Sequence, residues 1–389
     1  MRRWLLALAL LLGPVLPAGA MCAEATPATK GWPLWQTFAE RNLQSDGRLI
    51  DFQSAQMHST SEGQAYGMFF ALVANDRAAF DRMLAWTDVN LAGGMLGARL
   101  PAWQWNTGQG VIDANSAADA DLWLAYVLIE AGRLWHAPAL AQRGLALLNV
   151  IAKQEVLVVA GLGPVLLPGT IGFVSANGQV RLNPSYSPLP VLRRLAMADS
   201  TGPWKALAET STRLIAESAP RGMVADWVIW QPELGFVTDE NTHAIGGYDA
   251  IRVYLWLGMS SQNDAMARRQ GAILDGPSRW LAEHAELPEK IDTVDGSVSG
   301  STAPPGFYAA ILPYLKSRGD LSHYTKLRTR IQGELQVFTQ RGASTLSYYD
   351  LVLSLFGFGW SDGRFHFSPQ GVLETRWEQT CRFTASHSH

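Results

Sequence analysis

Three short stretches of the sequence carry acidic side chains where they could do chemistry. They read HSTSEGQAYGM, DANSAADADLWLAY and GGYDAIRVY, and their acids include Glu62, Asp119 and Asp249. Carboxyl groups set among aromatic side chains can act as a general acid and a general base when their surroundings separate their pKa values. Each acid also has a structural explanation, which must be weighed first.

Helix capping is the structural explanation for the first two stretches. Ser59-x-x-Glu62 fits a capping box ahead of a helix with apolar three- and four-residue spacing. Ser116-x-x-Asp119 is a second capping pattern, and Asp121 follows two residues later. Residues two apart on a helix point in nearly opposite directions, so only one of these two aspartates can face a site. These stretches alone leave capping and catalysis both open.

Asp249 has a weaker structural explanation. It can form an ion pair with Arg252 three residues later, but an exposed pair of this kind adds little stability. The helix continues as AIRVYLWLG, which is too apolar for an exposed element. An acid at the head of a buried helix needs a partner or a function, so this stretch favours a functional site.

Helical periodicity predicts the elements that position these acids. The expected helices cover 32–44, 61–74, 77–91, 116–132, 138–153, 187–198, 203–218, 247–258, 264–285, 305–316, 320–340 and 345–356. Their short spacing suggests six antiparallel pairs, with strand-like runs at 156–169, 178–182 and 223–230 as hairpin excursions. If the pairs close into a ring, the inner helices run parallel and their N-termini gather at one rim.

The starts of alternate predicted helices carry the acids, and also tyrosines. The tyrosines are Tyr186, Tyr248, Tyr308, Tyr348 and Tyr349. The helix dipole favours acids at N-termini but gives no reason for tyrosines there. The ring hypothesis therefore predicts one polar site, built from the heads of the inner helices.

Composition bounds the remaining possibilities. A hydrophobic fraction of 48% with 17% charged residues indicates one well-packed globular domain over residues 21–389. The net charge of −3 gives no basic footprint for nucleic acid. There is no H-E-x-x-H, G-x-S-x-G, P-loop or complete dinucleotide fingerprint, so we expect neither a metal nor a cofactor. The 15 tryptophans are enough to stack on flat ligand faces such as those of sugars.

The N-terminus is typical of an exported protein. Residues 1–20 combine two arginines, the apolar run WLLALALLLGPVL and a small-residue site, as in a signal peptide. After cleavage no membrane span is expected, and the protein is predicted to be periplasmic or secreted. Cys22 and Cys381 can form one disulfide in such a compartment, unless cleavage after Ala23 or lipoprotein processing uses Cys22 differently.

The stretch DANSAADADLWLAYVLIEAGRLW resembles the signature of glycoside hydrolase family eight. It departs from that signature at Ala118, Leu124 and Val127, and both aspartates are intact. TSEGQAYGM and YDAIRVYLW resemble the family's other two motifs. The resemblance implies an all-α fold, an (α/α)6 barrel of six inner and six outer helices, and inverting hydrolysis of a β-1,4-glucan chain.

The family's roles fall on matching positions of this sequence. Glu62 takes the position of the general acid, Asp249 that of the general base and Asp119 that of an aspartate that binds and distorts the sugar. Inversion requires the acid and base to stand ~6.5–9.5 Å apart. We expect Trp103, Trp105, Tyr186, Tyr248 and Arg252 to bind substrate, although the two tryptophans can equally pack a loop onto the barrel. These eight residues are the candidate site.

The sequence leaves two alternatives open, one about the proton on Glu62 and one about the function of the barrel. A helix N-terminus favours ionised Glu62, whereas a general acid must hold a proton, and a negative charge on Asp119 is one candidate for keeping it there. The resemblance extends to family members encoded with bacterial cellulose synthase, which makes a synthase complex a candidate partner. The alternative is a catalytically silent barrel that binds glucan as a scaffold.

Overall fold

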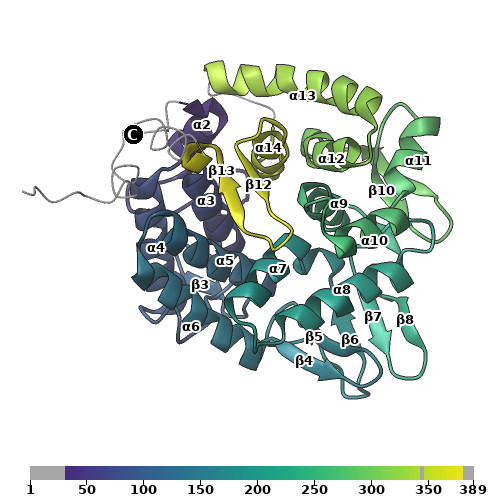
Figure 1. The fold of residues 1–389 in the computed structure, drawn as a ribbon, viewed down its shortest axis with the longest axis horizontal. Helices are drawn as coiled ribbons and strands as arrows, with labels where there is room; N and C mark the ends of the chain where they lie inside the picture. Colours follow the sequence, from purple (N-terminus) through teal and green to yellow (C-terminus); the bar gives the residue numbers. More distant parts are fainter. Residues whose placement is uncertain (1–30, 342–345, 380–389) are drawn as a thin grey trace, which may run out of the picture.

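The computed structural model describes residues 31–341 and 346–379, and helices make up most of these ranges (Figure 1). The helices are α2 (Pro33–Asn42), α3 (Ser61–Val73), α4 (Arg77–Ala92), α5 (Ala118–Leu134), α6 (Pro138–Gln154), α7 (Leu189–Ala198), α8 (Trp204–Ser218), α9 (Ala250–Met259), α10 (Ala265–Ile273), α11 (Gly276–Glu283), α12 (Pro305–Ser317), α13 (Leu321–Arg341) and α14 (Tyr348–Ser361), with a 3-10 turn, η2 (Pro184–Tyr186), before α7. The predicted signal peptide and both cysteines lie outside the described residues.

The helix expected over 264–285 is two helices, α10 and α11, which corrects the prediction. Pro277 lies in the first turn of α11. Proline lacks an N–H and disfavours helical geometry in the residue before it, so α10 cannot run through Gly276. The 3.6-residue periodicity continues across this break, which is why the pattern reads as one helix.

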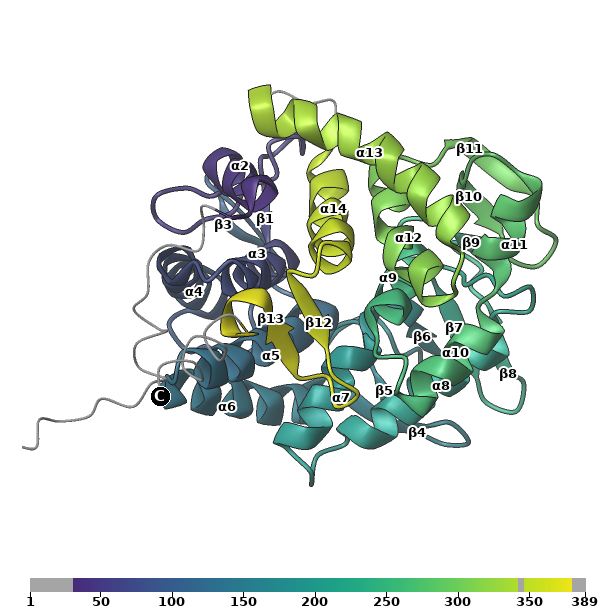
Figure 2. The same cartoon turned by 45° about the horizontal axis from the view of Figure 1, so that its top comes forward.

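Alternate helices form two concentric rings, as predicted (Figures 1 and 2). Within the described residues the inner ring is α3, α5, α7, α9, α12 and α14, and α2, α4, α6, α8, α10 and α13 pack outside it. Almost every residue of α3 and α5 is buried, whereas outer helices such as α6 bury one face. Phe356 of α14 closes the ring against Phe69 and Phe70 of α3, with ring centroids 5.3 and 4.6 Å apart. The (α/α)6 architecture is confirmed.

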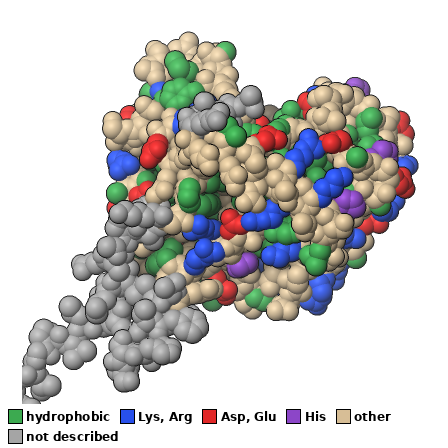
Figure 3. Space-filling model, turned by 90° about the horizontal axis from the view of Figure 1, so that it is seen from above, with side chains coloured by type: hydrophobic (Ala, Val, Ile, Leu, Met, Phe, Trp, Pro, Cys, Tyr) green, Lys and Arg blue, Asp and Glu red, His purple; other side chains and the backbone are tan. Residues whose placement is uncertain are grey.

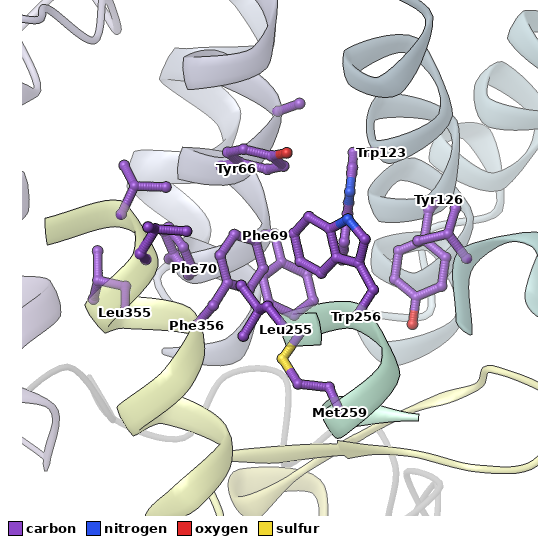
Figure 4. Packing of buried hydrophobic residues seen from close by; sticks show 14 of the residues in the cluster. Tyr66, Phe69, Phe70, Trp123, Tyr126, Leu255, Trp256, Met259, Leu355 and Phe356 are labelled. Carbon is purple, nitrogen blue, oxygen red and sulfur yellow. The ribbon is translucent and has the colours of Figure 1, made fainter. Parts of the chain in front are cut away.

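Aromatic side chains fill the axis of the inner ring (Figure 4). Trp123 of α5 lies 5.1 Å from Phe69, 5.4 Å from Trp256 of α9 and 5.8 Å from Tyr66, measured between ring centroids. The pairs with Phe69 and Tyr66 are edge-to-face, an arrangement that stabilises a core by about 0.5–1.5 kcal/mol per pair beyond the buried area. Part of the large tryptophan content is therefore core, and polar chemistry is left to the ends of the barrel.

A hairpin of β12 (Phe365–Phe367) and β13 (Leu373–Thr375) covers the C-terminal ends of α3 and α5. The Tyr126 hydroxyl donates to the carbonyl of Gly371 at 2.9 Å, and Trp377 Nε1 donates to the carbonyl of Leu72 at 3.1 Å. Gly371 has φ +73°, and a Cβ there would meet the carbonyl oxygen of Pro190 at 1.9 Å, so the turn requires glycine. This end of the barrel is closed.

The other strands are short and lie between helices. They are β1 (Ser59–Thr60), β2 (Gln104–Asn106), β3 (Gly110–Asp113), β4 (Val156–Val159), β5 (Gly163–Leu166), β6 (Val180–Leu182), β7 (Val228–Gln231), β8 (Gly235–Thr238), β9 (Ile245–Gly246), β10 (Pro288–Asp292) and β11 (Val298–Thr302). All pairings are antiparallel, in sheets β1-β2-β3, β4-β5, β6-β7-β8 and β11-β10-β9. The sequence predicts strands around β4 to β7 but not around β1 to β3, β8 to β11 or β12 and β13. The missed strands matter because β1 leads into α3 and β9 leads toward α9.

The outer surface carries charges of both signs. Basic and acidic side chains are interspersed on the face seen in Figure 3, as the small net charge of −3 leads one to expect. None of the helices in 31–341 and 346–379 is both long and apolar enough to cross a membrane.

Candidate active site

Three carboxyl groups meet at one buried guanidinium at the open rim of the barrel. Arg252 places Nη1 3.3 Å from Glu62 Oε1, and Nη2 2.8 Å from Asp249 Oδ1 and 3.8 Å from Asp119 Oδ2. Its Nη2 also donates to Ser185 Oγ at 2.9 Å. These residues come from α3, α5, η2 and the head of α9, so the N-termini of inner helices gather at one rim as the ring hypothesis predicts.

Glu62 stands in the first turn of α3, but the expected capping box is wrong. The N-cap is Thr60, whose side chain accepts from Gly63 N at 3.0 Å. The Ser59 hydroxyl instead donates to the carbonyl of Leu49 at 2.6 Å and accepts from Arg48 Nε at 2.9 Å. Because Thr60 caps the helix, the Glu62 side chain is free to turn toward Arg252, and 27% of it is exposed.

Asp119 and Asp121 point to different places, as their spacing requires. Asp119 accepts from Ala120 N at 2.8 Å with Oδ1, and its side chain is only 4% exposed at the floor of the rim. Asp121 is fully buried beside Glu155 at the end of α6, and burial first and then the charge of Glu155 raise the pKa of Asp121. Of the two signature aspartates, only Asp119 lies in the candidate site.

Burial governs the proton affinity of Asp119. Burial first, and then the charge of Glu62, raise the pKa of Asp119 to about 8, against the opposing charge of Arg252. At neutral pH the Asp119 carboxyl therefore holds a proton. The hypothesis that a negative charge on Asp119 keeps a proton on Glu62 stays a prediction; in the unliganded site the raised pKa belongs to Asp119, the more deeply buried of the two.

The predicted aromatic residues separate into two groups. Tyr186 lies beside the carboxyl groups, with the Arg252 guanidinium 5.9 Å from its ring centroid, and Tyr248 is 41% exposed next to Asp249. Trp103 is 38% exposed, and its carbonyl accepts from Ser61 N at 2.9 Å, which fixes it at the head of α3. Trp105 packs instead against Trp86 at 5.2 Å and under Arg48 at 4.5 Å.

Two of the remaining tyrosines face the site, and one does not. The Tyr349 hydroxyl donates to the carbonyl of Tyr248 at 2.7 Å, and a Cβ added to Gly63 would lie 2.7 Å from the Tyr348 hydroxyl. Tyr308 is buried and donates to Glu286 on the outer side of α12. The direction of the Tyr308 side chain depends on how α12 is rotated about its own axis, and the periodicity of the sequence does not fix that rotation.

The family model of the glycosyl hydrolases family 8 matches residues 9–363. The chain belongs to this family. An endoglucanase of Xanthomonas axonopodis pv. citri is 45% identical over 93% of this chain and 93% of its own. The crystal structure of an endo-1,4-D-glucanase from Vibrio fischeri superposes with a TM-score of 0.83 at 39% identity, covering 89% of this chain and 99% of that one. The endo-β-1,4-glucanase CMCax of Acetobacter xylinum gives a TM-score of 0.70 at 26% identity, covering 87% and 98%.

The family 8 rim also contains residues that sequence reasoning missed. Asp226 accepts backbone N–H groups at the head of α9, and Ser185 holds Arg252. Trp227 lies 6.0 Å from Tyr186 and stacks on Phe173 at 6.1 Å, so aromatic rings extend away from the carboxyl groups. The available signal for Asp226 was an acid interrupting the apolar run MVADWVIW. Across the described ranges, no group of three or more His, Cys, Asp or Glu side chains is arranged to hold a metal ion.

Proposed function

We propose that Glu62 is the general acid and Asp249 the general base of this family 8 enzyme, and that Asp119 binds and distorts the sugar at the cleavage point. The reaction is inverting hydrolysis of β-1,4-glucan, and the protein is an endo-β-1,4-glucanase, in line with its Xanthomonas and Vibrio relatives. The observation that carries the assignment of residues is the single Arg252 guanidinium shared by both carboxyl groups.

Arg252 supports these roles by setting the distance between acid and base. Inversion needs a gap of about 6.5–9.5 Å, so that a water molecule fits between the base and the sugar. Glu62 and Asp249 contact different nitrogens of the guanidinium, at 3.3 and 2.8 Å. The distance between the two contacting carboxylate oxygens therefore cannot exceed the sum of these two contacts and the distance between the two nitrogens. Both side chains are about a quarter exposed, at 27% and 26%, so both are open to a chain lying along the rim.

Acid catalysis also needs a proton in the cluster at neutral pH. Three carboxyl groups around one cation cannot all ionise without strong mutual repulsion. The pKa of Asp119, raised to about 8, indicates where that proton resides before substrate binds. In our proposal glucan binding displaces Glu62 from Arg252, and the shared proton then passes to Glu62, next to the leaving oxygen.

Substrate binding is assigned to aromatic residues of the rim. Trp103 and Tyr248 are exposed, Tyr186 is partly buried beside Arg252, and their rings can stack on sugar faces. The contacts of Trp105 and Arg252 favour supporting roles: Trp105 packs on Trp86, and Arg252, only 6% exposed, holds the carboxyl groups. The glucan chain is the proposed partner at this rim.

We also propose that the protein acts in the periplasm in connection with cellulose synthesis. The support is the signal-peptide pattern of residues 1–20 and the resemblance to family members encoded with cellulose synthase. Contact with a synthase complex belongs to the same proposal. Cell fractionation followed by co-purification with the synthase tests it, and a cytoplasmic, unassociated protein would contradict it.

The catalytic assignment is tested with Glu62→Gln, measured as release of reducing ends from carboxymethyl cellulose. We expect kcat to fall by about 10²–10⁴-fold, the usual contribution of a general acid. The anomeric form of the first product, followed by NMR, should be α for the wild type. Glu209→Gln, an exposed change on α8, is the matched control and should keep wild-type kcat.

Each result discriminates between functions. No release by the wild type would favour the catalytically silent glucan-binding scaffold. Equal release by wild type and Glu62→Gln would remove Glu62 from the mechanism, and a β product would exclude inversion.

A further inference from the structure

The helix that carries the proposed base does not cap itself. Asp249 is the N-cap of α9, yet its side chain makes no capping hydrogen bond, and its backbone is helical at φ −83° and ψ −47°. The first N–H groups of a helix have no partner within it, and an aspartate at the N-cap usually accepts one of them. The head of α9 therefore needs an acceptor from another part of the chain.

Asp226, in the segment between α8 and β7, supplies that acceptor. Its Oδ1 accepts from the backbone N–H of Gly247 at 2.8 Å, of Asp249 at 3.1 Å and of Ala250 at 2.7 Å. Asp226 is itself held by its own N–H, which donates to the carbonyl of Ile245 in β9 at 2.8 Å. One carboxylate oxygen thus fixes the turn that delivers Asp249.

This arrangement leaves the Asp249 carboxylate free. The N–H groups of Ile251 and Arg252, which an N-cap side chain usually accepts, bond to the carbonyls of Gly247 and Asp249 at 3.1 Å. Asp226 takes the remaining N–H of Ala250, so the Asp249 side chain can turn outward to bond Arg252 at 2.8 Å. The turn has little room to move, since a Cβ on Gly246 would lie 2.2 Å from the carbonyl oxygen of Val224. Loss of Asp226 would leave the N–H of Ala250 without an acceptor and favour rotation of the Asp249 carboxylate onto it, away from the rim, as Asp119 accepts from Ala120 N.

We propose that Asp226 is a positioning residue for the hydrolysis, which keeps the Asp249 carboxylate out of the cap of α9 and directed at the catalytic water. The inference rests on the proposed role of Asp249 as the base. Asp226 Oδ1 accepts from three N–H donors, and these contacts favour a positioning role over that of the base. Burial and the charge of Asp249 raise the pKa of Asp226 to about 6, so it remains largely ionised at neutral pH and a strong acceptor.

The test compares Asp226→Ala and Asp226→Asn by kcat, KM and Tm on carboxymethyl cellulose. We expect Asp226→Ala to lower kcat by about 10–100-fold, the effect of a misplacement of about 1 Å, with KM changed less than about threefold. Asp226→Asn keeps an oxygen acceptor and should recover most of kcat. If Asp226→Ala does not fold, Asp226→Ser, with a shorter acceptor, should give an intermediate kcat at unchanged KM.

Asp76→Ala is the matched structural control. Asp76 caps the outer helix α4 by accepting from Ala79 N at 3.1 Å, and also accepts from Trp35 Nε1 at 3.3 Å. Its loss should lower Tm by a few degrees with kcat unchanged. A fall in Tm with wild-type kcat in Asp226→Ala, like the control, would overturn the positioning role.

Asp249→Asn separates this inference from the proposed function. A large loss of kcat in Asp249→Asn, with wild-type kcat in Asp226→Ala, overturns the positioning role alone. Wild-type kcat in Asp249→Asn overturns the base assignment and the positioning role with it. If Asp226→Asn is as inactive as Asp249→Asn at unchanged Tm, Asp226 itself does the chemistry and the positioning role is wrong.

Discussion

The two ends of the barrel hold buried charges in opposite proportions. At the closed end one carboxylate, Glu130, accepts from Arg194 at 2.5 Å, from Arg133 at 2.9 and 3.0 Å and from Leu373 N at 2.9 Å. At the open rim one guanidinium, that of Arg252, serves three carboxyl groups. At the closed end, two guanidiniums and a backbone N–H donate to one carboxylate. At the rim, one guanidinium is shared by three carboxyl groups.

The two ends also differ in whether their buried polar groups have hydrogen-bond partners. Glu130 is fully buried, and both of its oxygens are hydrogen-bonded. At the rim, Asp119 Oδ2 and Arg252 Nε are buried with no hydrogen-bond partner in the described part of the chain. Natural proteins tolerate unsatisfied groups mainly where a ligand or a reaction uses them. The contacts of the closed end therefore stabilise the fold, and the unsatisfied groups at the rim support the proposed site.

Removing the closed-end carboxylate should produce the larger change in stability. Glu130→Ala leaves the guanidinium of Arg194, 10% exposed, and the N–H of Leu373 without this acceptor, whereas Arg133, 30% exposed, keeps its pair with Glu378. We expect the free energy of unfolding to fall by about 3–5 kcal/mol, as for a broken buried ion pair. Denaturant unfolding followed by circular dichroism measures this, and kcat should stay at the wild-type value well below the unfolding midpoint.

The rim variant Glu62→Gln provides the opposite case. Glu62 is partly exposed and 3.3 Å from Arg252, so its loss should change stability by about 1 kcal/mol or less. If Glu130→Ala instead kept full stability and lost activity, the division of roles between the two ends would be wrong.

Much of this architecture follows from local pattern. Inner and outer helices could be predicted because three- and four-residue spacing records which face of a helix is buried. The same spacing placed Glu62, Asp119 and Asp249 at helix heads and required Asp121 to point elsewhere. The family assignment, carried by motifs around these acids, is confirmed by the match over residues 9–363.

Side-chain partners from distant elements could not be predicted in this way. Asp226 serves α9 from the segment before β7, and Arg252 was expected to bind substrate before the structure placed it among carboxyl groups. The N-cap of α3 is one residue later than the pattern suggested, because the Ser59 hydroxyl bonds the carbonyl of Leu49 and Arg48 Nε. These side-chain partners depend on contacts between distant segments of the chain, which hydrophobic periodicity does not record.

The proton held by the rim carboxyl groups leads to a prediction about the pH dependence of kcat/KM. In the wild type kcat/KM should fall on the alkaline side as the shared proton leaves Asp119, whose pKa is raised to about 8. Asp119→Asn removes the like charge that makes full ionisation of the cluster costly. The alkaline limb should therefore move to lower pH, by about one unit.

The profile of kcat/KM between about pH 5 and 10 measures this shift, with Asp121→Asn as the neighbouring control. Asp121 lies on the same helix but faces Glu155, so its variant should keep the wild-type limb. An unchanged limb in Asp119→Asn would show that the catalytic proton does not depend on this carboxyl.

The smallest effect should come from the buried pair of Asp121 and Glu155, which lies one layer below the rim. Glu155 accepts from the Ser116 hydroxyl at 2.5 Å, and burial raises its pKa to about 7. A carboxyl whose pKa is raised on folding stabilises the fold below its unfolded pKa and loses that contribution as pH rises through the folded value. Wild-type stability should thus decline between about pH 4.5 and 7, in part because Glu155 ionises in the unfolded chain while it keeps its proton in the folded protein.

Glu155→Gln stays neutral at every pH and keeps an oxygen to accept from Ser116. Relative to the wild type, its Tm should therefore rise by a few degrees between about pH 5 and pH 8, with kcat unchanged. Parallel Tm curves would mean that Glu155 does not titrate on its own. A fall in kcat would instead attach this pair to the chemistry of the rim, because Asp121 lies only two residues from Asp119 and its pKa is raised partly by that neighbour.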